Sequence, residues 1–370
     1  MSPLVKKNIL LTPGPATTTE SVKCSQVVPD ICPREAEFGQ IMKYISTELT
    51  RLVADPDHYS TVLFGGSGTA AVESIINSVP NHEAVIIVNN GAYGKRMCEI
   101  ANVYGVDYFE FKSPPDDAID LAELERYIQS SARAVSHLAV VHHETTTGLL
   151  NKVKDIGELC KRYQIDMIVD AMSSFAAIPI QLKEMNIAFL AASSNKNLQG
   201  MAGVSFVIAE KSKLENLKGQ KPRSYYLDLY AQYSYFVEHG QMRFTPPVQT
   251  LYALRQAIEE LKQEGVDQRY ERYATSWKTL IHGLARLGLT YIIPEEHHSK
   301  IITSILEPHY AGYDFQSMHD YFYRKGIMIY PGKLEKLNTF RIANIGDITY
   351  KEMELFLELL ERYLSSIKCG

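Results

Sequence analysis

Two kinds of hydrophobic pattern alternate along the first 265 residues. Short runs rich in Val, Ile and Ala are typical of strands buried on both faces, and longer segments between them carry apolar residues at helical spacing. This β-α-β repetition predicts an α/β fold with a mostly parallel sheet covered by helices. The predicted strands are YSTVLFG (59–65), EAVIIVNN (83–90), DYFEF (107–111), SHLAVVHHE (136–144), DMIVDAMSS (166–174), AFLAASSN (188–195) and GVSFVIAE (203–210). The predicted helices are TAAVESIINSV (69–79), YGKRMCEIANVYG (93–105), DLAELERYIQ (120–129) and KVKDIGELCKRYQ (152–164).

The pattern changes near residue 265. A long helix follows two prolines in RFTPPVQTLYALRQAIEELKQEG, and the remaining hundred residues mix helices with short strands. Those strands are ITSILEP (302–308), GIMIYPG (326–332) and TFRIANIG (339–346). We therefore expect a large domain over residues 16–265 and a smaller α+β domain over residues 266–370, joined by an N-terminal arm of residues 1–15.

Charge and cysteine content narrow the classes of function. The formal net charge is −5, from 38 basic and 43 acidic residues spread along the chain, which argues against nucleic acid as a partner. Five cysteines, odd in number and without a CxxC pair, argue against a disulfide framework and a zinc site. No apolar run approaches the roughly 18 residues of a membrane span. We expect a soluble, cytoplasmic protein without a metal or membrane partner.

Polar residues that follow strands are the first candidates for chemistry, because ligands of open parallel sheets bind beyond the carboxyl ends of the strands. The glycine-rich turn FGGSGTAAVES, residues 64–74, leads from a strand into a helix. Glycines let backbone N–H groups approach an anion, and the helix N-terminus adds further donors, so a phosphate would fit there. A turn without ligand accounts for the same pattern equally well. Neither the Walker pattern nor GxGxxG is present.

Two further loops carry aromatic and hydroxyl groups. Tyr93 lies in the glycine-flanked turn VNNGAYGKR, where its ring could stack on a planar cofactor or simply pack. Three threonines follow a strand in VVHHETTTGLLN, residues 140–151. The neighbouring His142, His143 and Glu144 make a poor metal site, because adjacent strand residues point to opposite faces.

A carboxylate and a lysine complete the candidate groups. Asp170 ends a strand that should be buried on both faces, where an ionised carboxylate is costly unless it meets a cation. Lys196 lies among small and polar residues in AASSNKNLQGMAG, 26 residues later, and a lysine in a dry site becomes a nucleophile toward carbonyls. Each has an ordinary alternative, a helix cap or ion pair for Asp170 and a solvated loop for Lys196. Together, the phosphate cradle, stacking ring, hydroxyls, carboxylate and amine match the groups of pyridoxal 5′-phosphate.

The order of the sequence motifs, over essentially the whole chain, is that of a known protein family. The sequence resembles the class V aminotransferases of the fold-type I, pyridoxal-phosphate-dependent transferases, and most closely members that act on 2-aminoethylphosphonate. That resemblance implies a large domain with a mostly parallel seven-stranded sheet and a homodimer with shared active sites. The motifs that carry it are TPGP, GSGTAAVE, NNGAYGKR, HHETTTGLLN, VDAMSS, SSNKNLQG, RFTPP and FRIANIG.

The resemblance assigns roles to individual residues. It implies that Lys196 bonds covalently to the cofactor and later moves a proton, that Asp170 pairs with the ring nitrogen, and that Arg341 binds the substrate anion. A guanidinium fork can bind carboxylate or phosphonate. The other implied contacts are Tyr93 and Met172 on the two faces of the cofactor ring, Thr145 near its phenolate oxygen, Ser67, Gly68, Thr69 and Asn195 at its phosphate, Thr245 from the partner subunit, Pro13 and Gly14 at the substrate mouth, and Arg34 at the edge of the site.

The implied activity is a ping-pong transfer of an amino group between 2-aminoethylphosphonate and pyruvate, giving phosphonoacetaldehyde and alanine in either net direction. An alanine–glyoxylate or serine–pyruvate aminotransferase would share the cofactor site and Arg341. A cysteine desulfurase needs a nucleophilic cysteine, and none lies between Cys160 and Cys369. A ligand-binding relative without activity has no need for the whole set of site residues, and an NAD-dependent dehydrogenase would need the missing glycine fingerprint.

Overall fold

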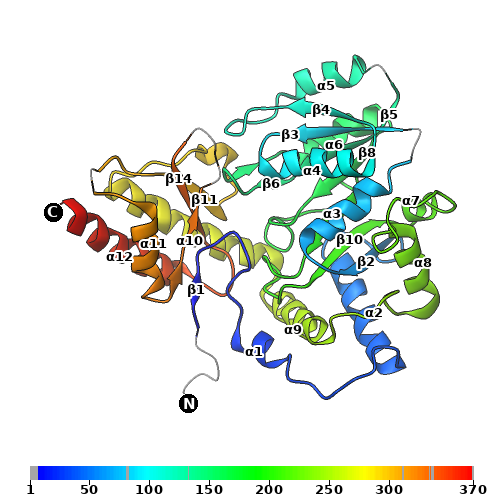
Figure 1. The fold of residues 1–370 in the computed structure, drawn as a ribbon, viewed down its shortest axis with the longest axis horizontal. Helices are drawn as coiled ribbons and strands as arrows, with labels where there is room; N and C mark the ends of the chain where they lie inside the picture. The colour runs from blue at the N-terminus through cyan, green and yellow to red at the C-terminus, as the bar shows by residue number, and fades with distance from the viewer. Residues whose placement is uncertain are drawn as a thin grey trace.

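A seven-stranded sheet organises the larger part of the chain (Figure 1). The computed structural model describes residues 7–80, 83–131, 133–310, 312–332, 334 and 337–368. The strands of the sheet are β2 (Tyr59–Gly65), β3 (Ala84–Asn89), β4 (Tyr108–Lys112), β5 (Val135–Val141), β8 (Asp166–Asp170), β9 (Ile187–Ser193) and β10 (Val204–Glu210). Their order is β2-β10-β9-β8-β5-β3-β4. β10 pairs antiparallel with both of its neighbours, β2 and β9, and the other four pairings of the sheet are parallel, so the prediction of a mostly parallel sheet is confirmed.

Helices cover both faces of this sheet because both faces are apolar. One core lies against α2 (Ala36–Arg51), α5 (Leu121–Gln129), α6 (Val153–Arg162) and α9 (Val248–Glu264). A second core, on the opposite face, lies against α3 (Gly68–Asn77), α4 (Ala92–Tyr104), α7 (Lys211–Glu215) and α8 (Leu229–His239). Burial on both sides explains why the strands read as unbroken apolar runs in the sequence.

Several predicted strands end earlier than expected, and one of them, at 136–144, is also divided. The run at 136–144 forms β5 only as far as Val141, and the chain then turns into a small antiparallel ribbon of β6 (His143–Glu144) and β7 (Leu149–Leu150). The side chain of Asn151 caps the end of β5 by donating to Val141 O at 2.7 Å. The ribbon places the three threonines beyond the carboxyl end of β5. There, Thr145 O and Thr146 O accept hydrogen bonds from Arg341 and Ser304 of the C-terminal part.

The C-terminal part has its own core around a three-stranded sheet. The long helices α10 (Val266–Arg286) and α12 (Tyr350–Lys368) pack side by side (Figure 1). The remaining elements are α11 (Phe315–Tyr323), the short 3-10 helix η1 (Glu295–His297), and the strands β11 (Ile302–Leu306), β12 (Ile327–Met328), β13 (Tyr330–Pro331) and β14 (Thr339–Ala343). The expected domain boundary falls between α9 and α10.

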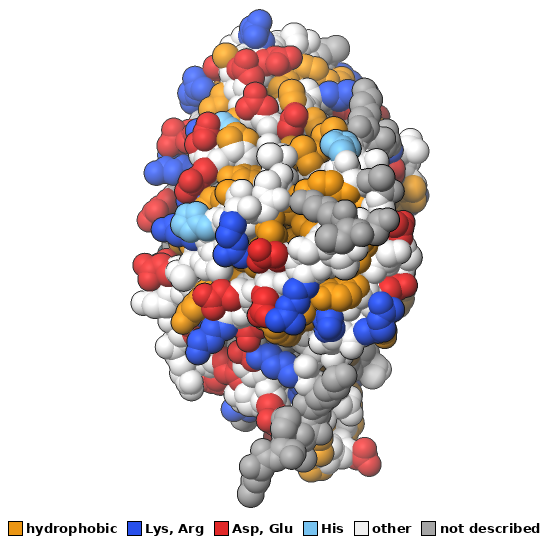
Figure 2. All heavy atoms as spheres, turned by 90° about the vertical axis from the view of Figure 1, so that its left-hand side faces the viewer, with side chains coloured by type: hydrophobic (Ala, Val, Ile, Leu, Met, Phe, Trp, Pro, Cys, Tyr) orange, Lys and Arg blue, Asp and Glu red, His pale blue; other side chains and the backbone are white. Residues whose placement is uncertain are grey.

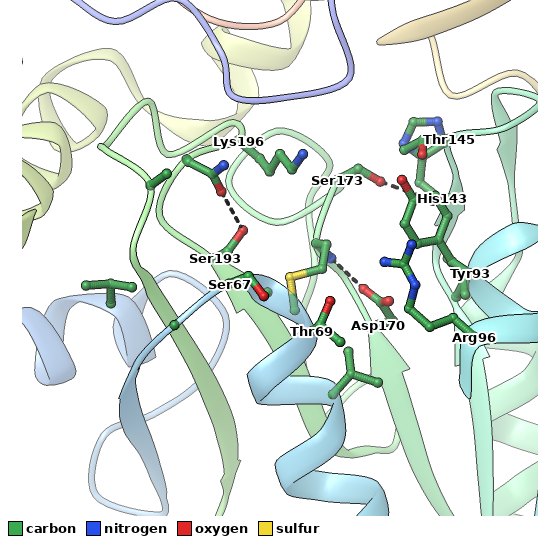
Figure 3. A pocket seen from close by; sticks show the side chains of 18 of the residues that line it. Ser67, Thr69, Tyr93, Arg96, His143, Thr145, Asp170, Ser173, Ser193 and Lys196 are labelled. Carbon is green, nitrogen blue, oxygen red and sulfur yellow. Dashed lines mark hydrogen bonds between the residues drawn. The ribbon is translucent and has the colours of Figure 1, made fainter. Parts of the chain in front are cut away.

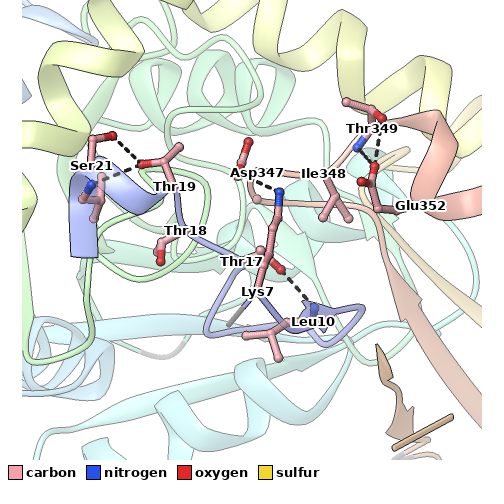
Figure 4. Close-up of polar contacts among 12 residues, drawn as sticks. Lys7, Leu10, Thr17, Thr18, Thr19, Ser21, Asp347, Ile348, Thr349 and Glu352 are labelled. Atoms are coloured by element: carbon pink, nitrogen blue, oxygen red, sulfur yellow. Dashed lines mark hydrogen bonds and ion pairs between the residues drawn. The ribbon is translucent and has the colours of Figure 1, made fainter. Parts of the chain in front are cut away.

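The N-terminal arm joins the two parts. Its strand β1 (Ile9–Leu10) pairs in parallel with β12, and the short helix α1 (Glu20–Cys24) packs on α9. Between these two elements, Thr17 O accepts a hydrogen bond from Asp347 N at 2.8 Å. Lys7, just before β1, places its Nζ 2.8 Å from Asp347 Oδ2 (Figure 4). Residues 10–18 are thereby held against the small sheet while they cross toward the large one.

The surface of the C-terminal part carries intermingled acidic and basic side chains (Figure 2). Neither sign dominates this face. Within the part of the chain that the structure describes, no helix is long and apolar enough to cross a membrane.

Candidate active site

A cavity of about 500 Å³ lies at the carboxyl ends of the central strands, beside the N-termini of α3 and α4 (Figure 3). This is where open α/β sheets bind their ligands. Nine residues selected from the sequence line it: Ser67, Gly68, Thr69, Tyr93, Thr145, Asp170, Met172, Asn195 and Lys196. They come from the ends of five different strands, so the fold brings together residues up to 129 positions apart in sequence, from Ser67 to Lys196.

The glycine-rich turn forms the floor of the cavity at the start of α3. Ser67 precedes the helix with extended backbone (φ −70°, ψ 165°), and Gly68 is its first residue. A Cβ atom on Gly68 would lie 2.4 Å from Met172 Sδ, so this position accommodates no side chain without moving Met172. The first N–H groups of a helix have no partner within it, and here they border the cavity. The turn is therefore built to bind an anion.

Asp170 lies at the last position of β8 with 6% of its surface exposed. Burial raises the pKa of its carboxyl to about 6, and the Met172 N–H with the charges of Arg96 and Lys196 opposes that rise. The hydrogen bond from Met172 N to Asp170 Oδ1 is 2.9 Å long. A carboxylate this buried favours a cationic ligand in the cavity, because an additional positive charge would offset the cost of its ionisation.

Lys196 approaches the cavity from the loop after β9, with the N-terminal arm behind it. Its Nζ donates to Pro13 O at 3.0 Å, and the neighbouring Asn195 O accepts from Ala16 N at 2.9 Å. Gly14 has φ +138°, and a Cβ atom there would lie 2.0 Å from the lysine Nζ. Pro13 and Gly14 therefore lie against the lysine itself, although neither lines the cavity.

Glu144 organises the ribbon that carries Thr145. Its carboxylate is fully buried and accepts hydrogen bonds from Tyr93 N (3.2 Å), Thr146 N (3.3 Å) and Thr146 Oγ1 (2.6 Å). One side chain thus ties the start of α4, and with it Tyr93, to the threonine loop. The Thr145 hydroxyl is buried without a hydrogen-bond partner among the described residues, which is the state expected of a group that serves a ligand.

Arg341 lies on β14, with 1% of its surface exposed, and is not among the residues that line the cavity. Its Nε donates to Pro331 O (3.0 Å) and its Nη1 to Thr145 O (3.3 Å). Its Cζ lies 4.9 Å from the centre of the Tyr330 ring.

The Nη2 of Arg341 is buried and has no partner within the described residues. Burial lowers the pKa of the guanidinium, and Tyr93, Tyr330 and Glu144 oppose that shift. These contacts occupy Nε and direct the Nη1–Nη2 end toward the Thr145 loop.

The structure does not bring two other candidates into the cavity. Arg34 donates to Met242 O (2.7 Å) and Arg243 O (3.2 Å), so it fixes the segment before Thr245 rather than reaching the site of its own chain. Thr245 is exposed and does not line the cavity. A role for Thr245 in a partner subunit's site stays a prediction.

Sequence reasoning missed several residues of the cavity wall. Arg96 lies one turn after Tyr93 on α4, and its position three residues further along the helix could have placed it on the same face. His143 also lines the cavity, and burial lowers its pKa to about 3, so its imidazole is neutral. Among the described residues, no three His, Cys, Asp or Glu side chains are arranged to hold a metal ion.

A mostly parallel sheet with one lysine, one buried carboxylate and a helix N-terminus around the same cavity defines a fold-type I transferase. The chain belongs to the class-V aminotransferase family, which it matches over residues 23–335. The match spans both parts of the chain and includes the whole cavity wall.

Curated relatives match along nearly the whole chain. A 2-aminoethylphosphonate–pyruvate transaminase of Lysinibacillus sphaericus is 40% identical over 358 residues, covering 96% of this chain and 97% of the relative. An enzyme with the same name from Vibrio vulnificus is 39% identical with the same coverage. The crystal structure of an alanine–glyoxylate aminotransferase from Nostoc sp. superimposes with a TM-score of 0.90 at 26% identity, over 98% of this chain and 97% of that one.

Proposed function

We propose that this enzyme uses pyridoxal 5′-phosphate to transfer the amino group between 2-aminoethylphosphonate and pyruvate, forming phosphonoacetaldehyde and L-alanine. The observation that carries the proposal is a cavity holding Lys196 and Asp170 in a chain 40% identical, over its length, to a relative of that name. We further propose that it works in the cytoplasm as a homodimer.

The residues of the cavity fit the proposed cofactor. Asp170 offers a buried carboxylate to the ring nitrogen, and the start of α3 offers N–H groups to the phosphate. Thr145 offers a hydroxyl that has no hydrogen-bond partner among the residues that the structure describes. Tyr93 and Met172 would flank the ring, and Ser67, Thr69 and Asn195 would add donors at the phosphate. When bound, pyridoxal phosphate supplies an aldehyde for covalent bonding to an amine and a ring that withdraws electrons from the adjacent carbon.

Lys196 is the proposed catalytic residue in both half-reactions. Its amine would hold the cofactor, because a lysine in a dry site is a nucleophile toward carbonyls. The same amine, when neutral, would act as the base that takes the proton from the substrate carbon and returns it. Pro13 O, 3.0 Å from Nζ, orients the amine within the site.

Arg341 is the proposed binding residue for both substrate anions. Because Nε and Nη1 are held by Pro331 O and Thr145 O, the guanidinium is oriented before a ligand arrives. Its Nη2, which has no partner within the described part of the chain, would meet the carboxylate or phosphonate. One cation can serve both anions since they bind in separate half-reactions.

The test is a direct assay of the purified protein with pyridoxal phosphate and pyruvate. Each of 2-aminoethylphosphonate, serine and alanine is offered as the amino donor, with glyoxylate as a second acceptor. We expect alanine and phosphonoacetaldehyde to form from the phosphonate and pyruvate faster than products form from the other pairs. Turnover of alanine with glyoxylate, without turnover of the phosphonate, would favour the function of the Nostoc enzyme instead.

Replacement of Lys196 by Ala should remove both turnover and the visible absorption band of the bound cofactor. Lys183→Ala is the matched control, since Lys183 is an exposed lysine outside the cavity. Persistence of the band in Lys196→Ala would show that another amine holds the cofactor.

A further inference from the structure

Arg96 is a cation in the cavity wall to which the proposed function gives no role. It lies on α4 three residues after Tyr93, and its guanidinium carbon lies 4.9 Å from the centre of the Tyr93 ring. Figure 3 shows the guanidinium directed from α4 toward the carboxylate of Asp170. The positive charge of Arg96 also acts on that carboxylate.

We propose that Arg96 is a positioning residue, held in place by the Tyr93 ring, that keeps Asp170 ionised so that the carboxylate can receive the cofactor ring nitrogen. The inference rests on the proposed function. It concerns the protein's own charge distribution, which can be measured by cofactor binding without turnover.

The surroundings of Asp170 require such a charge. The side chain is 6% exposed, and burial raises its pKa to about 6. Among the described residues, the charged or titratable groups that act on it are Arg96 from α4, Lys196 from the loop after β9, and Glu144 from β6. An ionised Glu144 would oppose the ionisation of Asp170, so the stabilisation of the Asp170 carboxylate by charge comes from Arg96 and Lys196.

The two cations differ in whether they keep their positive charge during the reaction. Lys196 must lose its charge to act as a nucleophile or a base. A guanidinium stays protonated throughout the physiological range. Arg96 is therefore the protein cation that still acts on Asp170 in the working enzyme.

The position of Arg96 is set by neighbours that are themselves fixed. Residues three apart on a helix lie on one face, so the guanidinium can rest on the Tyr93 ring as a cation–π pair. Tyr93 N is bound by the buried Glu144 carboxylate at 3.2 Å, which anchors the first turn of α4. A flexible arginine is thereby held beside a carboxylate on a different element.

The experiment compares cofactor binding by the wild type, Arg96→Gln and Arg96→Lys between pH 5.5 and 8.5, followed by equilibrium dialysis. Loss of the charge raises the pKa of Asp170, so the acid limb of binding should move up by about one pH unit in Arg96→Gln. Below pH 6 this variant should bind about tenfold more weakly than the wild type, and above pH 8 the two should bind alike. Arg96→Lys keeps the charge and should retain most of the wild-type profile.

Two controls separate this role from a structural one. Lys95→Gln removes an exposed cation from the same helix and should leave the profile unchanged. A cofactor analogue with carbon in place of the ring nitrogen offers Asp170 no cation, so the upward shift caused by Arg96→Gln should disappear with it. Circular dichroism checks that each variant is folded.

The outcomes are distinguishable. If the wild type binds no pyridoxal phosphate, the proposed function fails. If the wild type binds it, an unshifted acid limb in Arg96→Gln, tighter binding by that variant, or the same shift with the carbon analogue would overturn the role of Arg96. An Arg96→Lys profile identical to that of Arg96→Gln would overturn the requirement for charge.

Discussion

Two almost fully buried charges define the site at the scale of single residues. Asp170 is 6% exposed and Arg341 is 1% exposed, and charged residues are rarely buried to this extent unless a partner compensates. Asp170 has cations facing it within the cavity, whereas Arg341 is held by two backbone carbonyl groups and one aromatic ring. A cationic group of a ligand would therefore be attracted to Asp170, and an anionic group to Arg341.

Replacement of Arg341 by Lys tests whether its geometry matters as well as its charge. A lysine cannot reproduce the bonds to Pro331 O and Thr145 O or the stacking on Tyr330, so it should bind both substrate anions more weakly. We expect KM for 2-aminoethylphosphonate and for pyruvate to rise by about tenfold or more in the variant. Each half-reaction is followed separately through the cofactor absorbance.

The matched control for this experiment is Arg286→Lys. Arg286 is a surface residue, paired with Glu361 at 3.5 Å and with 64% of its side chain exposed, so its replacement should leave both KM values unchanged. A rise confined to one substrate in Arg341→Lys would mean that a different residue binds the other anion.

At the scale of elements, the N-terminal arm connects the site to the C-terminal part of the chain. It pairs with β12, bonds to Asp347 through Thr17, and passes behind Lys196 at Pro13 and Gly14. The lysine is consequently backed by a segment that is anchored on the C-terminal part of the chain. A shift of that part would be transmitted to the lysine through this arm.

Replacement of Gly14 by Ala tests the fit between arm and lysine. The new Cβ atom would lie 2.0 Å from Lys196 Nζ, at a backbone φ of +138°, so the lysine must move away. We expect the visible cofactor band to form more slowly and turnover to fall. Gly288→Ala also places a side chain at positive φ, at a cost of about 1–2 kcal/mol for a left-handed residue, but at φ +69° the new Cβ atom meets no atom of the described residues within 4 Å.

The comparison between the two glycine variants separates the contact with Lys196 from the effect on the backbone. The thermal unfolding temperature should fall in both variants, since both place a side chain at a positive φ. Only Gly14→Ala should affect the cofactor band. Equal bands and equal turnover in the two variants would mean that the arm places no constraint on Lys196.

The elements of the sheet could be predicted because each leaves a local signal. A strand buried on both faces is a continuous apolar run, and all seven runs identified in the sequence became strands of the main sheet. The ribbon His143–Glu144 and Leu149–Leu150 left no such signal. It is held by bonds from Tyr93 N to Glu144 and from Asn151 to Val141 O, and the order of the residues does not reveal either bond.

At the scale of the whole molecule, the site too could be predicted only where its residues leave a local signal in the sequence. Strand ends supplied nine cavity residues because parallel strands meet at one edge, which is a rule about topology. The anchoring of Arg341 depends on how the C-terminal sheet docks against the Thr145 loop. Helical spacing could place Arg96 on the same face as Tyr93, but it could not show that this face is turned toward Asp170. Such contacts require the assembled structure.

The exposed Thr245 raises the question of what completes the site in the whole assembly. It follows a segment held by Arg34 through Met242 O and Arg243 O, and the resemblance to class V aminotransferases places it at the cofactor phosphate of a partner subunit. A fixed, exposed polar residue outside its own cavity is consistent with a shared site. In a two-fold dimer each subunit would complete the site of the other.

Mixing two inactive variants decides whether Thr245 acts across the dimer. Lys196→Ala lacks the catalytic amine, and Thr245→Glu places a negative charge where the phosphate should bind, so each homodimer should be inactive. In a mixed dimer, the subunit that retains Lys196 would receive an intact Thr245 from its partner. Unfolding and refolding the two variants together in equal amounts should therefore restore about a quarter of the wild-type activity, since half of the dimers are mixed and each has one complete site. If Thr245 served its own chain, no combination of subunits would contain a complete site, and the refolded mixture would stay inactive.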